Sequence, residues 1–399
     1  MSVAILLEEA WERLFALAPS TRSETIPVGD AAGRYLAADL LARRTRPASD
    51  QSAMDGFAVA GAGPWTIVGE ARAGASLARE LSRGEAARIS TGAACPTGTD
   101  GIVIVEEAAV TGSTLRAPQP ERGRWIRRRG FDFADGEVVL GAGSRIDAAQ
   151  LALARAAGHA RLTVGRQPSV AVIEIGDELV DDLEDCACDR LPASNGMMVA
   201  TMARGAGASA RTVGPLPDDR AAVTRALVEN PDAQVIVTTA GASVGEHDHV
   251  RGALEDIGAD LAFWRVAIRP GKPLLVARRQ RPRPLGDQLV LGLPGNPASA
   301  YVTAYLFLLP LLRAMQGAAH PLPAAVPLPL AAPFPAGGDR REFQRARFVN
   351  GQVLPLAERD SSSLRTLAAA DLLIDRAIGA PPAAAGDPVP CWWLGHGPA

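Results

Sequence analysis

A proline-stiffened turn at Arg269–Pro273 carries two cations, Arg269 and Lys272, within this 399-residue chain. Arg265 lies four residues upstream, and we expect one strand to carry Arg265 and Arg269 on the same face. Cations held by a rigid turn bind a compact oxyanion such as phosphate better than cations on a flexible segment. A solvated surface turn is the alternative. The turn, which ends at Pro273, therefore predicts an anion site.

A second loop, at residues 238–245, follows an apolar run and precedes a helical pattern. Its small residues, Gly241 among them, would let backbone N–H groups approach a phosphate, and Ser243 adds a hydroxyl donor. An ordinary tight turn between strand and helix is the alternative. By itself this loop does not distinguish the two.

A third loop consists of Pro294, Gly295 and Asn296 and precedes a long apolar helix, whose first turn contains Ser299. The N-terminus of a helix attracts anions because its first N–H groups lack partners within the helix. Asn296 is expected to cap this helix. The alternative is that proline and asparagine simply begin the helix.

Three carboxylates follow the expected strands of the same region. Glu178 comes after the first strand, Asp218 after the next, and Asp248 after the glycine-rich loop. Carboxylates beside bound phosphates are the ligands that Mg²⁺ takes in proteins, so the three together predict a magnesium site. Alternatively, Asp218 and Asp219 are helix caps and Glu178 is a surface residue.

The elements that position these loops form three kinds of domain. Alternating strands and helices over residues 166–317 predict an α/β domain with a doubly wound, mostly parallel sheet. Short β-type runs with many Gly and Pro indicate an inserted β-rich domain at 51–135. Helical patterns flank it, so residues 1–50 and 136–165 are assigned to a helical N-terminal domain, and residues 318–399 to a C-terminal β-barrel-like domain.

Composition excludes several classes of protein. A net charge of -3 argues against a nucleic-acid-binding protein. The segment Gln288–Leu312 lacks charge, but Pro294 and Pro297 divide it into strand, turn and helix, so we expect a buried helix and no membrane span. The cysteines Cys186 and Cys188 lack further ligands at zinc-site spacing. A reduced, cytoplasmic protein is the simpler interpretation.

Several segments resemble, in chain order, motifs of the molybdopterin molybdenumtransferase family, the MoeA type that includes the E domain of gephyrin. No single motif is decisive, but their order along nearly the whole chain is specific. The matching segments are Ser52–Ala58, Ile89–Ala93, Ile126–Asp132, Gly176–Leu179, Val244–Asp248, Phe263–Pro273, Leu293–Ser299 and Glu342–Arg345.

The resemblance implies an enzyme of molybdenum cofactor biosynthesis. Such an enzyme hydrolyses adenylyl-molybdopterin with Mg²⁺, inserts molybdate into the dithiolene and releases AMP. It also implies an elongated cytoplasmic homodimer, with each site between the α/β domain of one subunit and the β-rich domain of the other. Molybdopterin adenylyltransferase and molybdenum enzymes would be its partners, and neither nucleic acid nor a membrane would be involved.

The resemblance assigns roles to individual residues. Asp55, Glu178, Asp218, Asp248 and Lys272 would be catalytic, with Glu178, Asp218 and Asp248 holding the metal. The substrate-binding residues would be Thr91, Asp132, Gly241, Ser243, Arg265, Arg269, Pro273, Pro294, Gly295, Asn296, Ser299, Arg345 and Ser362.

The chain also departs from the family pattern near the expected phosphate site. Ala240 stands where a glycine is usual, Ala193 replaces an acid, and Glu174 replaces a small hydroxyl residue. An added methyl group can obstruct the approach of a phosphate to the backbone. The alternative function is therefore a catalytically weakened paralogue that binds, stores or delivers molybdopterin.

Overall fold

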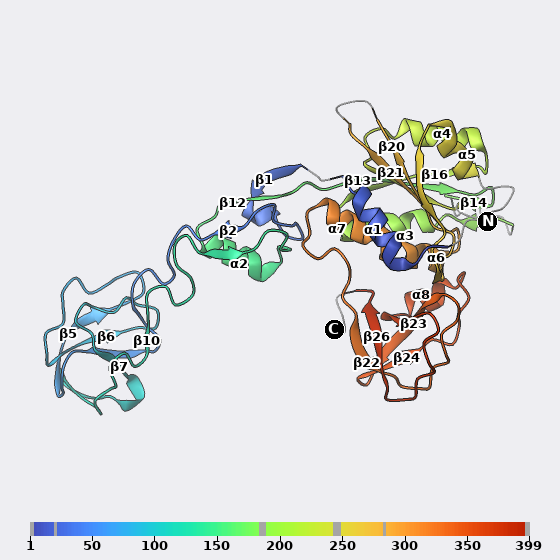
Figure 1. Ribbon diagram of the computed structural model, residues 1–399. Coiled ribbons are helices and arrows are strands. Elements are labelled where there is room, and N and C mark those ends of the chain that lie inside the picture. Colours follow the sequence, from blue (N-terminus) through green and yellow to red (C-terminus); the bar gives the residue numbers. More distant parts are fainter. Residues whose placement is uncertain (1–3, 20–21, 183–188, 242–248, 282–284, 396–399) are drawn as a thin grey trace.

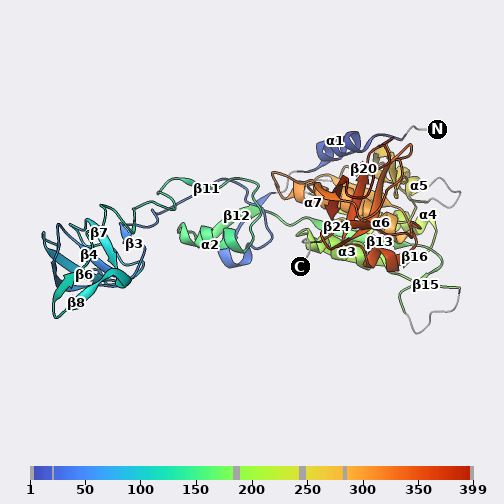
Figure 2. The same ribbon diagram turned by 90° about the horizontal axis from the view of Figure 1, so that it is seen from below.

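The structure is a computed structural model that describes residues 4–19, 22–182, 189–241, 249–281 and 285–395. The chain forms a body and a long arm (Figures 1 and 2). The body contains the α/β sheet and the C-terminal sheet, and the arm ends in a separate β-sheet domain. This multidomain arrangement confirms the predicted fold class.

The α/β sheet has six strands, of which four are parallel. Strand β13 is central in the parallel part, with β16 on one side and β17 followed by β21 on the other; β20 and β18 complete the sheet as antiparallel strands. Helix α3 covers one face, whereas α4 and α5 cover the other. The bounds are β13 (Ser169–Ile175), β16 (Ser209–Leu216), β17 (Val235–Thr239), β18 (Asp260–Trp264), β20 (Leu275–Arg279), β21 (Gln288–Leu293), α3 (Asn195–Gly205), α4 (Arg220–Glu229) and α5 (His249–Asp256).

One predicted strand is divided between two sheets. The strand expected to carry Arg265 and Arg269 ends instead at Trp264, because Arg265 has a φ of 70° that breaks the extended chain. Ile268–Arg269 then forms β19 and pairs with the C-terminal sheet. The expectation that Arg265 and Arg269 share one face of a strand is therefore wrong.

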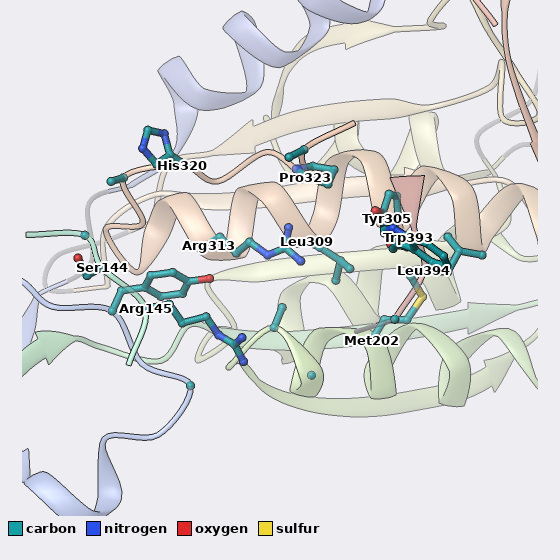
Figure 3. Close-up of a pocket in the computed structure, with 18 of the residues that line it drawn as sticks. Ser144, Arg145, Met202, Tyr305, Leu309, Arg313, His320, Pro323, Trp393 and Leu394 are labelled. Carbon is teal, nitrogen blue, oxygen red and sulfur yellow. Dashed lines mark hydrogen bonds between the residues drawn. The ribbon is translucent and has the colours of Figure 1, made fainter. Parts of the chain in front are cut away.

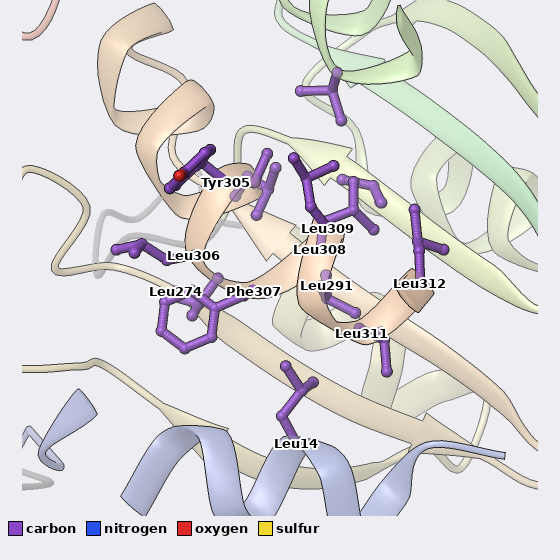
Figure 4. Packing of buried hydrophobic residues seen from close by; sticks show 14 of the residues in the cluster. Leu14, Leu274, Leu291, Tyr305, Leu306, Phe307, Leu308, Leu309, Leu311 and Leu312 are labelled. Carbon is purple, nitrogen blue, oxygen red and sulfur yellow. The ribbon is translucent and has the colours of Figure 1, made fainter. Parts of the chain in front are cut away.

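A single buried helix crosses the body from Pro297 to Met315. It consists of α6 (Pro297–Thr303), the π-helical turn η3 (Ala304–Leu308) and α7 (Leu309–Met315). Its length and composition would suit a membrane span, but 83 % of that window is buried. Figure 4 shows Leu308, Leu311 and Leu14 of α1 (Leu7–Leu17) in the same apolar cluster. It is thus a core helix, as the sequence predicts.

Helix α1 also supplies a hydrogen bond that this core helix requires. Pro310 has no N–H, so the carbonyl of Leu306, four residues earlier, lacks its usual helical donor. The indole Nε1 of Trp11 donates to that carbonyl at 2.8 Å. The Trp11 ring also stacks on Trp392, with 6.0 Å between centroids. One side chain therefore joins α1 to the core helix and to the C-terminal sheet.

The C-terminal sheet is mostly antiparallel and receives β19 as its edge strand. Its core contains Leu330, Phe334, Val353 and Ile374. The elements are β19 (Ile268–Arg269), β22 (Val326–Pro329), β23 (Arg341–Val349), β24 (Gln352–Pro355), α8 (Leu364–Ala368), β25 (Leu372–Arg376) and β26 (Pro388–Trp393).

The arm connects to the body through the antiparallel pair β1 (Ser23–Pro27) and β12 (Arg161–Gly165). Beyond that pair lie a short two-stranded sheet with α2 (Ala148–Ala156) and then the six-stranded sheet of the tip. The remaining elements are η1 (Val28–Asp30), β2 (Leu40–Leu41), β3 (Gln51–Ser52), β4 (Gly56–Val59), β5 (Trp65–Ala71), β6 (Glu85–Ile89), β7 (Gly101–Ile104), η2 (Val105–Glu107), β8 (Ala109–Thr111), β9 (Thr114–Arg116), β10 (Ile126–Arg127) and β11 (Val138–Leu140), with β14 (Leu179–Val180) and β15 (Leu191–Pro192) in the body.

The bond between Trp11 and Leu306 predicts a specific energetic coupling. Trp11→Phe should lower the free energy of unfolding by about 1–3 kcal/mol, because it leaves a buried carbonyl without a donor. Pro310→Ala restores a backbone N–H four residues after Leu306. In the Trp11→Phe/Pro310→Ala double variant, the loss measured by urea denaturation should therefore shrink. Strictly additive effects of the two substitutions would contradict this account.

Candidate functional site

The candidate site lies at the carboxyl edge of the parallel strands. The chain leaves β13 toward β16 on one side and returns to β17 on the other, so the strand order reverses between β13 and β17. Ligands of doubly wound sheets bind in the crevice that such a reversal creates. The loops after β13, β16, β17 and β21 all meet at this edge.

Two of these loops are joined by a pair of aspartates. The Asp218 N–H donates to Asp177 Oδ1 at 3.0 Å, and the Asp177 N–H donates to Asp218 Oδ2 at 3.4 Å. Glu178 folds back beside Gly176, where a Cβ would lie 2.6 Å from its Oε2. Asp218 is therefore not the cap of α4; the adjacent Asp219 is, accepting from the Ala222 N–H at 2.8 Å.

These carboxylates do not by themselves form a metal site in the described part of the chain. Each bonded aspartate uses one oxygen for the neighbouring N–H, and Glu178 is exposed. The residues suit Mg²⁺, which takes a few carboxylates and completes its shell with substrate phosphate and water. Among described residues there is no group of three or more His, Cys, Asp or Glu that could hold a metal ion. Asp248, the third predicted ligand, lies outside them.

The loop before the core helix is anchored by two neighbours. Asn195 Nδ2 donates to the Gly295 carbonyl at 2.6 Å. Asn296 is the N-terminal residue of the helix, but its side chain does not cap it: Nδ2 donates to Ser361 Oγ at 3.0 Å, while the Ala298 N–H donates to the Ser361 carbonyl at 2.9 Å. The capping expected from Asn296 is therefore wrong, and Ser361 of the C-terminal domain contributes instead. Pro294 is buried.

Helix α3 is also capped from outside. Ser194 precedes it without a side-chain capping bond. Its first N–H groups, of Asn195 and Gly196, donate at 2.9 Å each to the two carboxylate oxygens of Glu174 on β13. Glu174 is only 5 % exposed. Burial raises its pKa above the usual value for a carboxyl, although these N–H bonds act in the opposite direction. The cap of α3 is thus supplied by Glu174.

The proline-stiffened turn lies against the core helix. At Gly271, where φ is 101°, a Cβ would lie 2.4 Å from Thr303 Cγ2 and 3.8 Å from the Ser299 carbonyl oxygen. Only glycine allows this approach, which brings the cationic turn beside the first turns of α6. The turn therefore lies beside the start of the helix that follows the Pro294–Asn296 loop.

The three predicted cations of this region differ in their surroundings. Lys272 is exposed, and its ammonium has no ion-pair partner among the described residues. Arg269 Nη1 lies 3.5 Å from Glu342 Oε1. The Arg265 guanidinium stacks over the Trp264 ring, 4.2 Å from its centroid. Lys272 is thus the cation that the structure leaves available to an anion. Pro273 is half-buried, and Ser299 is buried at the first turn.

Arg345 holds the loop that reaches the core helix. It is 4 % exposed, and its guanidinium donates to the carbonyls of Glu358, Asp360 and Ser363 at 3.2, 2.8 and 3.2 Å. Ser362 Oγ donates to Asp360 Oδ1 at 2.7 Å. The residue expected to bind molybdate thus positions the 358–363 loop, to which Ser361 and Ser362 belong, and its role as a direct ligand stays a prediction.

The predicted residues of the β-rich domain lie on the arm. The Thr91 N–H donates to Asp55 Oδ1 at 2.7 Å, so the structure brings these two residues together. A Cβ on Gly56 would lie 2.0 Å from the Val103 carbonyl oxygen, which explains the glycine after Asp55. Asp132 is exposed and lies 3.4 Å from Arg46 Nε. Figure 2 places β3 and β4, which flank Asp55, at the arm's tip, far from the α/β sheet.

Parts of the glycine-rich loop lie outside the described residues, including Ser243 and Asp248, as do Cys186 and Cys188. Gly241 is described and has a φ of 77°. Ala240 has a φ of 157°, a positive value that residues with a Cβ rarely adopt, so its methyl group has a conformational cost here. A Cβ on Gly295 would lie 3.7 Å from the Ala240 Cβ, so this loop and the Pro294–Asn296 loop face each other.

A large hollow of about 880 Å³ lies elsewhere, between arm and body. Figure 3 shows Arg145 of the arm facing Arg313 of α7, with Met202 and Trp393 nearby. None of the lining residues is a predicted site residue. Chemistry therefore favours the open strand edge over this hollow as the candidate site.

Comparison with known proteins agrees with this geometry. Residues 5–158 match the MoeA N-terminal region (domains I and II), residues 171–314 a probable molybdopterin binding domain, and residues 327–394 the MoeA C-terminal region (domain IV). Molybdopterin molybdenumtransferase 2 of Mycobacterium tuberculosis H37Rv is 33 % identical over 94 % of this chain and 95 % of that protein. The chain belongs to the molybdopterin molybdenumtransferase family.

Other members of the molybdopterin molybdenumtransferase family are similarly related. The enzyme of Haemophilus influenzae is 32 % identical over 78 % of each chain. Two structures of the MoeA protein from Pyrococcus horikoshii share the fold, at TM-scores of 0.84 and 0.78 with 23 % and 24 % identity; each covers 98 % of this chain and 100 % of its own. The family resemblance expected from the sequence motifs is confirmed.

The sequence did not predict two residues that shape the site, Asp177 and Ser361. It also did not predict that Glu174 caps α3. Asp177 stands next to Glu178, and its place after a buried strand was a usable signal. Ser361 carries no such signal, because it reaches the site only when the C-terminal domain packs on α6. Glu174 was noticed as a departure from the family, but its bonds to α3 were not expected.

The three hydrogen bonds from Arg345 predict that a substitution there loosens the 358–363 loop. Arg345→Met should cost about 2–3 kcal/mol of stability, because three carbonyls lose a charged donor. Amide hydrogen exchange over residues 358–363 should accelerate, and Arg347→Met, exposed on the same strand, should leave it unchanged. Unaltered exchange in Arg345→Met would show that the loop does not depend on this clamp.

Proposed function

We propose that this chain inserts molybdenum into molybdopterin, by Mg²⁺-dependent hydrolysis of adenylyl-molybdopterin with molybdate as co-substrate and AMP as product. The observation that carries the proposal is the meeting of carboxylates, a cationic turn and the N-terminus of the core helix at one edge of the sheet. Membership of the family supports it, since the relatives are named for this transfer. A pyrophosphate and a molybdate are both anions that such a set of groups would bind.

The carboxylates suit the metal part of this reaction. Glu178, Asp218 and Asp248 would hold Mg²⁺, which, when bound, neutralises charge on the pyrophosphate. Asp177 would keep the Asp218 loop in place through their paired N–H bonds. The chain's own contribution is therefore to orient the phosphate and the attacking water at the strand edge.

The basic residues near the turn would bind the anionic groups of the substrates. Lys272, which has no ion-pair partner among the described residues, would bind phosphate or molybdate directly. Arg265 and Arg269 would add positive charge close by, and fixed cations stabilise charge that develops on a transferring phosphoryl group. Gly241 and Gly295 would let the substrate approach the backbone closely, and the hydroxyl of Ser299 would donate a hydrogen bond to it.

The arm supports a site shared between two subunits. Asp55 and Thr91 lie on its tip, far from the strand edge of the same chain (Figure 2). For both to reach substrate, the tip of one subunit would have to meet the body of a second, as in a homodimer with twofold symmetry. Molybdopterin adenylyltransferase would supply the substrate, molybdenum enzymes would receive the product, and the cytoplasm would be the compartment.

A substitution at Asp218 tests the reaction. Purified protein with adenylyl-molybdopterin, Mg²⁺ and molybdate should release AMP. Asp218→Asn should lower the rate by about 10²-fold or more, because a metal ligand loses its charge. Asp219→Asn, one residue away at the cap of α4, should change it only a few-fold. Absence of AMP release by the wild-type protein at every molybdate concentration would refute the proposal.

A mixing experiment tests the shared site. Asp55→Ala and Asp218→Asn homodimers should both be nearly inactive, since every site lacks one group. Statistical mixing of the two should restore about a quarter of wild-type activity, because half the dimers then hold one intact site of two. If Asp55 serves its own subunit, mixing will restore nothing.

A second candidate is a paralogue that binds and delivers molybdopterin with little or no hydrolysis. The observation in its favour is the buried carboxylate of Glu174 at the N-terminus of α3, inside the region where phosphate is expected. The AMP assay separates the two functions, because a carrier would bind molybdopterin without releasing AMP.

A further inference from the structure

We propose that Glu174 is a specificity-determining residue: its carboxylate fills an anion position in the crevice, so that the ligand binds with no phosphate at the N-terminus of α3. The inference rests on the proposed function only in identifying the ligand as a phosphorylated pterin. The anion position itself follows from the contacts of Glu174.

The carboxylate occupies the place that a bound oxyanion would take. Both of its oxygens accept N–H groups from the first turn of α3, an 11-residue helix, at 2.9 Å. Two convergent N–H groups at the positive end of a helix dipole are the arrangement that binds phosphate in other proteins. Here the chain provides the anion itself.

The surroundings are shaped to that carboxylate. A Cβ on Gly196 would lie 2.4 Å from Glu174 Oε2, so only glycine leaves the required space. Arg and Lys side chains form no salt bridge with Glu174 among the described ion pairs. The helix N-terminus is therefore the main compensation for burying this negative charge.

A second observation indicates that the anion position offers one more hydrogen-bond donor than the Glu174 carboxylate uses. Thr239 is paired in register with Glu174 on the adjacent strand, and both side chains lie on the face that α3 covers. Thr239 is 1 % exposed, and its Oγ1 has no hydrogen-bond partner among the described residues. Leaving a buried hydroxyl without a partner is unfavourable, so Thr239 marks a place where a tetrahedral anion would supply one acceptor more than a carboxylate does.

The position belongs to the candidate site. Asn195, whose N–H binds Glu174, also donates its Nδ2 to the Gly295 carbonyl, and its Oδ1 is buried without a partner. Asn195 thus connects the Glu174 carboxylate to the loop that begins the core helix. An incoming phosphate would meet a negative charge where the helix terminus would otherwise attract it.

The test uses inorganic phosphate as the probe. Glu174→Ser empties the position and should create a saturable phosphate site, detected as a rise in melting temperature and by titration calorimetry. Its affinity for phosphate should exceed that of the wild-type protein by about tenfold or more, as one or two charge-assisted hydrogen bonds provide. Glu174→Gln, which fills the same space, should gain no such site.

Asp219→Ser is the matched control, because Asp219 caps α4 from an exposed position. It should show no saturable phosphate effect. If Glu174→Ser is unstable in phosphate-free buffer, phosphate should rescue its folding. Failure to gain phosphate binding, or failure of rescue, would overturn the proposal. Absence of AMP release by the wild-type protein would instead refute the proposed reaction and leave this result unaffected.

Discussion

The helix from Pro297 to Met315 is the constraint on which the rest of the body depends. It is apolar over most of its surface, so most of its surface must be covered. The α/β sheet, α1 and the C-terminal sheet provide that cover, and Trp11 satisfies the carbonyl that Pro310 leaves without a donor. Because the helix begins at the strand edge, the packing that buries it also fixes the Pro294–Asn296 loop. Stability and site geometry therefore share one element.

Local patterns in the sequence predict much of this molecule. The apolar runs that became β13, β17 and β21, the broken apolar segment, and the loops after the strands were all expected. Features that depend on distant contacts were not. Ile268–Arg269 pairs with β23 only because the C-terminal domain docks there, and Ser361 replaces the capping expected of Asn296 for the same reason. No window of the sequence contains both partners of such contacts.

Polar groups at the strand edge serve two purposes. Some are committed to holding backbone: Asp177 to its neighbouring loop, Arg345 to the 358–363 segment, Glu174 to α3. Others, Lys272 above all, are left for a ligand. Residue type alone does not separate the two groups, since an arginine beside an anion site can equally clamp a loop. Burial and the number of carbonyls within reach decide between these roles.

The arm extends a long way from the narrow junction that β1 and β12 form with the body. Because the tip lies far from this junction, a small rotation at the junction would become a large displacement at the tip. In the proposed homodimer, the position of Asp55 would then depend on the surface of the second subunit that the tip contacts. A composite site built this way would be assembled by docking, and it could open for exchange of a bulky product without any rearrangement inside the body.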